Sequence, residues 1–168
     1  MASRTIQTQS RRYSTQLIDA LTSVLALELL APSRAIYLFS GWVTDTPILD
    51  NSFGQYRPLL PESTGTTLHL STILVALAER DTEIRMAVRD DDINRRFVDL
   101  VQHYNVRIKL SPNLHIKMLV SEHFCWEGSM NFTYSGIHRN PEAIILTTDK
   151  TRVSKAWLDA ERTWESLS

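Results

Sequence analysis

The sequence contains a single cysteine, Cys125, among 168 residues. One cysteine excludes an intramolecular disulfide framework and a zinc site built from cysteines, and it fits a reducing compartment. Long hydrophobic runs are also missing: residues 25–31 fall far short of the roughly 20 apolar residues that span a bilayer. Residues 1–14 lack the apolar core of a signal peptide. We therefore expect a soluble, cytoplasmic protein without a membrane partner.

A strong excess of charge of either sign is absent too, because the formal net charge is −1. Without a global basic field, a nucleic acid or another polyanion would have to meet a local patch. Arg11 with Arg12 and Arg95 with Arg96 are candidate patches, although such pairs are more often solvated faces of helices.

Hydrophobic periodicity predicts strands that alternate with helices in one domain. Helices are expected at residues 11–30, 70–80, 92–104 and 153–164, and strands at residues 35–43, 83–89, 106–110, 115–121, 124–129 and 142–147. One of Asp90, Asp91 and Asp92 can cap the third helix. Residues 1–10 are expected to be frayed, and residues 44–68 to form a long loop. This order indicates an α/β sandwich with a mixed central β-sheet flanked by helices.

The segment that carries chemistry begins at His115. If residues 115–121 form a strand, His115 and Lys117 project from the same face. Apolar neighbours on both faces predict a buried strand, so the Lys117 ammonium should reach solvent or meet an anion. Taken singly, such a histidine is more often a hydrogen-bonded core residue, and such a lysine a strand-edge residue.

Ser129 and Asn131 repeat the spacing of two residues, and Gly128 lacks a side chain where a close backbone approach would need that space. A lysine, a serine and an asparagine aimed at one point supply a cation and neutral donors, which suit phosphoryl oxygens. A histidine beside them can attack phosphorus or transfer a proton near neutral pH. Gly-Ser before Asn is by itself usually a turn, so the prediction rests on the combination.

This combination resembles the His-x-Lys-x4-Asp and Gly-Ser-x-Asn motif of the phospholipase D superfamily, called HKD, and most of all the small bacterial nucleases with one motif. The motif covers residues 115–131, and weaker similarity extends over residues 39–43, 131–136 and 139–143. The resemblance implies a phospholipase D-like domain over residues 35–168, with residues 1–34 as a helical segment packed on it.

The resemblance also implies roles for individual residues. His115 would be the nucleophile that forms a phosphohistidine or, in its symmetry mate, the general acid. Lys117, Ser129 and Asn131 would hold the phosphoryl oxygens. Glu142 would orient a catalytic imidazole, commonly that of the opposing half-site, because an acceptor on Nδ1 fixes the tautomer.

Gly128, His138 and Arg139 are expected to contact the substrate. Glu122 stands where the motif has an aspartate, and its spacing to Gly128 is one residue shorter than usual. Since that aspartate generally serves structure near the hairpin turn, we expect a remodelled turn; the alternative is that Glu122 is only a solvated turn residue.

One motif in a two-imidazole mechanism implies a homodimer, with two copies of His115 at the twofold axis. No metal and no cofactor are implied, because paired lysines and neutral donors supply the charge stabilisation. The small size of the chain and its single motif favour DNA as the substrate, by analogy with the nuclease branch of the superfamily. The run of residues 134–142 also resembles the phospholipase D-like component of the Dpd system, which modifies and restricts DNA through 7-deazaguanine. That resemblance implies a role in defence against foreign DNA, with partner proteins.

Two alternatives stay open at this point. One is a phospholipase or phosphatidyltransferase, although no basic amphipathic helix supports work at a membrane. The other is a catalytically silent module that binds nucleic acid or phosphate within a larger complex.

Overall fold

A computed structural model describes residues 3–7 and 11–167 of the chain. Its strands are β1 (Ser3–Gln7), β2 (Ala35–Ser40), β3 (Pro47–Asp50), β4 (Thr67–His69), β5 (Glu83–Val88), β6 (Val106–Leu110), β7 (Met118–Val120), β8 (Cys125–Gly128) and β9 (Ala143–Thr147). Its helices are α1 (Arg11–Leu30), α2 (Leu70–Ala78), α3 (Asp92–Val101), α4 (Tyr134–His138) and α5 (Lys150–Ser166). Within these residues, no helix is both long enough and apolar enough to cross a membrane.

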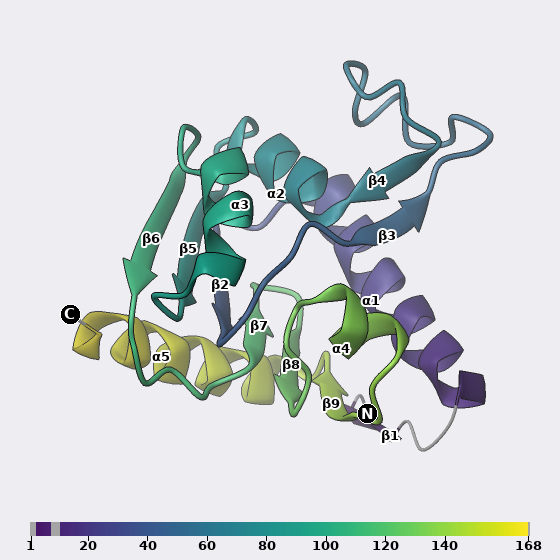
Figure 1. Cartoon of the computed structure of the whole chain (residues 1–168). Helices are drawn as coiled ribbons and strands as arrows, with labels where there is room; N and C mark the ends of the chain where they lie inside the picture. The colour runs from purple at the N-terminus through teal and green to yellow at the C-terminus, as the bar shows by residue number, and fades with distance from the viewer. Residues whose placement is uncertain (1–2, 8–10, 168) are drawn as a thin grey trace.

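Seven strands form one mixed sheet in the order β1-β9-β8-β7-β2-β5-β6. The strands β2, β5 and β6 run parallel, and β7, β8, β9 and β1 continue the sheet with antiparallel pairing. The predicted α/β fold with a mixed central sheet flanked by helices is confirmed (Figure 1). Because of the strand directions, the carboxyl ends of β2, β5 and β8 share one edge with the amino ends of β7 and β9.

Helices cover both faces of this sheet: α5 crosses one face, and α1 to α4 lie on the other side (Figure 1). Successive residues of β2 point to opposite faces. Ile36 and Leu38 join the larger core together with Leu21 of α1, whereas Tyr37 and Phe39 join the smaller core under α5. Burial on both faces explains why β2 is an uninterrupted apolar run in the sequence.

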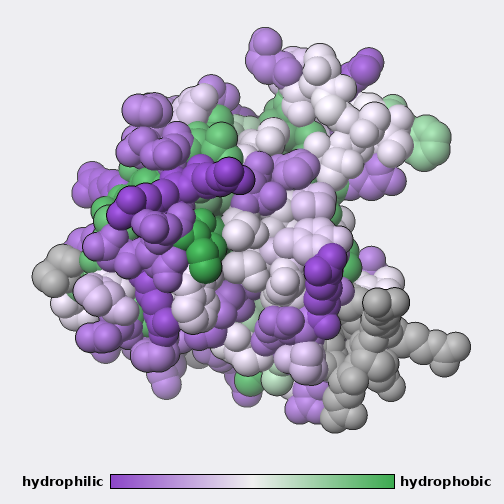
Figure 2. Space-filling model, in the orientation of Figure 1, coloured by the Kyte–Doolittle hydropathy of each residue, from purple (hydrophilic) through white to green (hydrophobic). Residues whose placement is uncertain are grey.

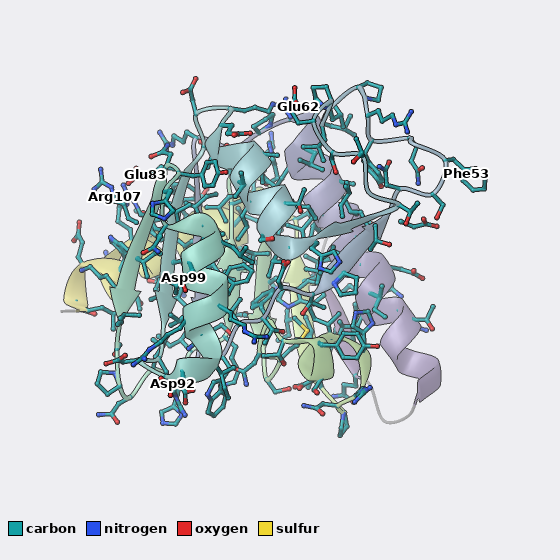
Figure 3. All side chains as sticks on the ribbon, turned by 45° about the horizontal axis from the view of Figure 1, so that its top comes forward. Phe53, Glu62, Glu83, Asp92, Asp99 and Arg107 are labelled. Carbon is teal, nitrogen blue, oxygen red and sulfur yellow. The ribbon has the colours of Figure 1, made fainter. Side chains whose placement is uncertain are left out.

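The strands β3 and β4 form a separate hairpin, and residues 51–66 between them project from the body as an arm (Figure 1). The expectation of a loop without strands in this region is therefore wrong at both ends of the arm. Asn51 closes its base, since Nδ2 donates to the Gly65 carbonyl oxygen (2.9 Å) and Oδ1 accepts from the Tyr56 amide (3.0 Å). Phe53 is 93% exposed and points away from the body (Figure 3), on an arm of mostly intermediate hydropathy (Figure 2).

The expectation of a frayed N-terminus is wrong for residues 3–7, which pair with β9 as an antiparallel edge strand. Only Ile6 of β1 is buried, so the strand has little apolar signal of its own. Residues 1–2 and 8–10 lie outside the described residues. Two smaller differences concern helices: α3 ends at Val101 instead of near residue 104, and α4 was not predicted.

Candidate active site at the edge of the sheet

His115 lies in an irregular segment just before β7, because that strand begins only at Met118. The prediction that His115 and Lys117 share the face of one strand is therefore wrong. The structure nevertheless brings the two residues together, since Nζ of Lys117 donates to the His115 carbonyl oxygen (2.8 Å). The His115 side chain is exposed, so it is accessible to a ligand instead of being a core histidine.

The imidazole of His115 has a cationic neighbour that the motif did not indicate. Nη2 of Arg89, at the end of β5, lies 2.9 Å from Nδ1 of His115, and its Nε donates to the Leu114 carbonyl oxygen (2.9 Å). A guanidinium has donors and no acceptor. In this arrangement Nδ1 must therefore accept and carries no proton.

Ser129 and Glu142 face each other across the ends of β8 and β9. The Ser129 hydroxyl donates to Oε2 of Glu142 and accepts from the Ala143 amide (3.0 Å). The two backbones also pair here, since the Ser129 amide donates to the Ala143 carbonyl oxygen (3.0 Å). Glu142 is thus placed at the site, and in this state its carboxylate binds the serine that was predicted to hold a phosphoryl oxygen.

Asn131 is held through its side-chain oxygen, which accepts from the Trp42 amide (3.3 Å) and lies 3.4 Å from Oγ of Ser40. The Trp42 amide can only donate, so it identifies that atom as the oxygen, and the orientation of the Asn131 amide follows from this hydrogen bond. Gly41 fits tightly among these groups: a Cβ there would lie 3.3 Å from the Asn131 oxygen and 3.4 Å from Nε of Arg89 and from the Leu114 carbonyl oxygen. Asn131, Arg89 and the His115 segment therefore surround one glycine.

Gly128 is required by backbone geometry. Its φ is +155°, and a Cβ at this position would lie 2.0 Å from the Ala143 carbonyl oxygen. This confirms the predicted close backbone approach, which brings Ser129 beside β9. The Gly128 amide also donates to the Lys117 carbonyl oxygen (3.3 Å) and so ties the end of β8 to the lysine.

Glu122 lies in the turn between β7 and β8, at the ends of these strands that are remote from His115. Its carboxylate binds Arg34 twice, accepting from the backbone amide (2.9 Å) and from Nε (3.0 Å). Glu122 is therefore an exposed turn residue, as that alternative has it, and its carboxylate in addition binds Arg34. The next residue, His123, contacts the Ala31 carbonyl oxygen through Nε2 (2.7 Å), so both side chains fasten the turn to the end of α1.

His138 and Arg139 lie at the end of α4 and contact other groups than His115. The His138 ring packs on Tyr134, with 4.6 Å between ring centroids, and its Nε2 is 3.3 Å from the Pro47 carbonyl oxygen. The Arg139 guanidinium lies 5.0 Å from the Tyr134 ring centroid. A substrate contact by these two residues stays a prediction.

Three residues that the sequence analysis did not assign to the site support it. The Arg89 guanidinium lies 4.4 Å from the centroid of the Trp42 ring, whose Nε1 donates to Asp91 (3.2 Å). The Ile93 amide, then Trp42 and Arg89, lower the pKa of the Asp91 carboxyl. Asp91 was predicted only as one of three possible caps, and it is the N-cap of α3. Their position in the sequence could have indicated their place at the site, because they follow the parallel strands β2 and β5, whose carboxyl ends meet at one edge.

The buried side chain of Asn94 links the loops that follow β2 and β5. Its Nδ2 donates to the carbonyl oxygens of Gly41 (3.0 Å) and Arg89 (2.8 Å), and its Oδ1 accepts from the Val43 amide (2.7 Å). One side chain thereby satisfies three backbone groups and fixes the ends of β2 and β5 relative to each other.

Two cations at this edge can bind an anion, beside the carboxylates of Asp91 and Glu142. Lys117 and Arg89 are cations, and Asn131 adds an amide group whose oxygen is already bound inward. Across residues 3–7 and 11–167, no group of three or more His, Cys, Asp or Glu side chains could hold a metal ion. The arrangement can bind phosphoryl oxygens beside an exposed imidazole.

Comparisons with known proteins agree with this description. The sequence profile of the family described as "Cardiolipin synthase, PLD-like domain" matches residues 9–164. A comparison with curated proteins gives no match.

Solved structures share the fold at low sequence identity. NucT from Helicobacter pylori has a TM-score of 0.67 and 13% identity, over 98% of this chain and 96% of that one. Nuc from Salmonella typhimurium, a phospholipase D family member, has a TM-score of 0.63 and 11% identity, over 99% and 95%. The archaeal chromatin protein TrmBL2, described as showing a novel mode of DNA binding, has a TM-score of 0.56 and 10% identity, over 100% and 54%.

Proposed function

Because the chain belongs to the phospholipase D-like superfamily of phosphodiesterases, we propose that it hydrolyses a phosphodiester of DNA at His115, without a metal ion. The observation that carries the proposal is the meeting of His115, Lys117, Ser129, Asn131 and Glu142 at one sheet edge. The exposed imidazole supplies a nucleophile, and the cation and donors around it suit the charge of a phosphoryl group in transfer.

The proposed reaction has two steps. In the first, Nε2 of His115 forms a bond to phosphorus while the ester P–O bond breaks, and a second imidazolium gives its proton to the leaving oxygen. In the second, that imidazole takes a proton from water, the water oxygen attacks phosphorus and the N–P bond breaks. Lys117, Ser129 and Asn131 hold the phosphoryl oxygens throughout, and Glu142 accepts from a catalytic imidazole.

We propose that the second imidazole is His115 of a second copy. A groove of about 470 Å³ adjoins the site, and Lys117 and Gly128 form part of its lining together with Ile116 and Ile145. The two isoleucines are 38% and 40% exposed, beside the edge strand β1. A twofold contact over this apolar surface would cover it and bring two copies of the site toward the axis.

The resemblance of residues 115–131 to single-motif nucleases supports DNA as the substrate, and the near-neutral net charge makes a local patch necessary. Arg89 and Lys117 supply such a patch at the site itself. The similarity of residues 134–142 to the Dpd component supports a role in restriction of foreign DNA together with partner proteins. The test compares the cleavage rate of DNA that carries 7-deazaguanine with that of DNA that lacks it. A difference between the two rates would support this role, and equal rates would contradict it.

The hydrolytic proposal is tested with purified protein in EDTA, on DNA, on phospholipid vesicles and on bis(p-nitrophenyl) phosphate. We expect turnover of DNA and of the small diester, loss of turnover in His115→Ala, and full activity in the control His103→Ala. Cleavage of lipid alone would instead identify a lipase, and tight DNA binding without turnover a silent binding module. Activity that EDTA abolishes would contradict the metal-independent mechanism.

The shared site is tested by mixing. When wild-type and His115→Ala chains are unfolded, mixed in equal amounts and refolded, about one quarter of the dimers have two intact histidines. The activity of the mixture should therefore be about one quarter of the activity of the same total amount of refolded wild-type protein. Half of the wild-type activity, or a fully active monomer in sedimentation at micromolar concentration, would show that each chain works alone.

A further inference from the structure

The helix α4 lies between two residues of the candidate site, Asn131 and Glu142. It folds back onto Asn131, because a Cβ on Gly136 would lie 2.2 Å from the Asn131 carbonyl oxygen. Its first residue, Tyr134, follows Asn131 by three positions, so their Cα atoms are at most roughly 11 Å apart. This span equals about three base steps of 3.4 Å along a DNA strand. Tyr134 is therefore within reach of nucleotides that flank a phosphate held by Asn131.

Tyr134 carries an aromatic ring at the surface, where it is 44% exposed. The ring of His138 packs on it with 4.6 Å between centroids and 31° between planes, and the Arg139 guanidinium lies 5.0 Å from the Tyr134 centroid. We call these three side chains the α4 stack. Aromatic rings next to a cation are the combination that binds single-stranded nucleic acids, because bases stack on the rings and the cation contacts the backbone.

Hydrogen bonds fix the α4 stack to the loop that follows β2. The Tyr134 amide donates to Oγ1 of Thr44 (3.0 Å), and the Thr44 amide donates to the Phe132 carbonyl oxygen (3.0 Å). Nε2 of His138 lies 3.3 Å from the Pro47 carbonyl oxygen. Side chains that are already held in place lose little conformational entropy when a base stacks on them, which favours binding.

A base can add to the α4 stack only if one of its faces is free. In a duplex both faces are covered by neighbouring base pairs, and turning a base out costs about as much as one stacking contact gains. In a single strand that cost is small. Each stacked base then strengthens binding roughly 5- to 150-fold, so the α4 stack favours unpaired strands.

We propose that the α4 stack binds an unpaired base next to the scissile phosphate, so that the His115 site acts preferentially on single-stranded DNA. This rests on the proposed function for the reaction and for the place of the phosphate. The two main contributions differ in kind. Stacking on Tyr134 depends on the presence of a base, whereas the charge of Arg139 acts on the backbone whether or not a base is attached.

The first test measures binding of oligothymidine and of an abasic strand of the same length and charge, in His115→Ala protein so that neither strand is cut. Tyr134→Ala should bind oligothymidine about tenfold more weakly or worse and the abasic strand unchanged. Tyr134→Phe keeps the ring and should bind like the parent. The matched control is Tyr104→Ala, which removes a tyrosine of equal exposure (43%) before β6, at the opposite edge of the sheet.

The same titrations at several salt concentrations separate the cation from the ring. Arg139→Met should weaken binding of both strands alike and should lower the slope of log affinity against log salt by about one. Tyr134→Ala should leave that slope unchanged. An equal loss on oligothymidine and on the abasic strand in Tyr134→Ala would overturn the inference, since stacking needs a base.

The second test measures turnover with His115 intact. Wild type should cut single-stranded DNA faster than the same sequence as a duplex. Tyr134→Ala should raise KM for the single strand about tenfold or more and change KM for the duplex little. Equal cleavage of both forms by wild type would also overturn the inference, as would an unchanged KM for single strands in Tyr134→Ala.

The two proposals fail separately. If oligothymidine binds through Tyr134 but the wild-type protein hydrolyses no DNA, the base-binding role of the α4 stack stands and the hydrolytic function is wrong. If DNA is hydrolysed through His115 while Tyr134→Ala is indistinguishable from Tyr104→Ala, the function stands and the role of the α4 stack is wrong.

Discussion

Replacing Gly128 with alanine perturbs the point where β8 and β9 meet at the site. The added Cβ would lie 2.0 Å from the Ala143 carbonyl oxygen and 3.0 Å from both its carbonyl carbon and the Ile144 Cα. These neighbours belong to the backbone of β9, so no side chain can turn aside. The φ of +155° adds strain for any L-residue with a Cβ. The strand must therefore shift, which breaks the pairing of Ser129 with Ala143.

We expect Gly128→Ala to lower the free energy of unfolding by about 3–5 kcal/mol, the range for strain at a special φ combined with a lost backbone pairing. Urea titrations followed by tryptophan fluorescence measure this loss as a lower midpoint at similar m. Gly65→Ala is the matched control: its Cβ would meet the Thr67 carbonyl oxygen only at 3.3 Å, and its φ is not positive. A change below about 1 kcal/mol in Gly128→Ala, or equal losses in both variants, would refute the steric argument.

Four further predictions test single contacts. Burial raises the pKa of the Cys125 thiol to about 12, so Ellman's reagent should label it only in unfolded protein; rapid labelling of native protein would contradict its placement. Hydrogen bonds lower the pKa of Asp91, so its stabilising effect is present above its unfolded pKa and is lost as pH falls through its folded pKa. Asp91→Asn should be less stable than wild type at neutral pH and converge with it in strong acid, in urea titrations at both values. Asn94→Leu should cost about 3 kcal/mol or more, because three backbone groups lose their partner; a neutral result in the same titration would disprove that accounting. Glu122→Gln weakens an exposed ion pair, so stability should change by less than about 1 kcal/mol, with turnover of the small diester unchanged.

The local sequence predicted those elements whose signal is apolar and continuous. Helix α1 and the strands β5 and β6 lie where periodicity places them, and the alternation of elements was sufficient for the fold class. The edge strand β1 was missed because it buries only Ile6 and exists through pairing with β9, more than a hundred residues away. The short β7 was predicted too long, since the segment around His115 bonds to Arg89 instead of extending the sheet ladder.

Some residues of the candidate site could be named from the sequence, and others only from the tertiary structure. Lys117, Gly128, Ser129 and Asn131 could be named as candidates from the sequence, because they lie at the adjoining ends of the paired strands β7 and β8 and therefore come near one another. Arg89 could not, since nothing in residues 83–89 distinguishes an arginine that meets His115 from one on a solvated strand end. Its assignment needed the parallel pairing of β2 with β5, which carries both strand ends to the same edge.

The sequence by itself determined which residues resemble the phospholipase D-like motif: a histidine, a lysine and neutral donors in the order of that motif. The tertiary structure decided which partners these side chains bind. It placed Arg89 on Nδ1 of His115 and Glu142 on the hydroxyl of Ser129, contacts between residues that lie 26 and 13 positions apart in the sequence. Spacing along a chain fixes which groups can reach a site, whereas hydrogen-bond donors and acceptors pair only after the sheet has set their distance and direction.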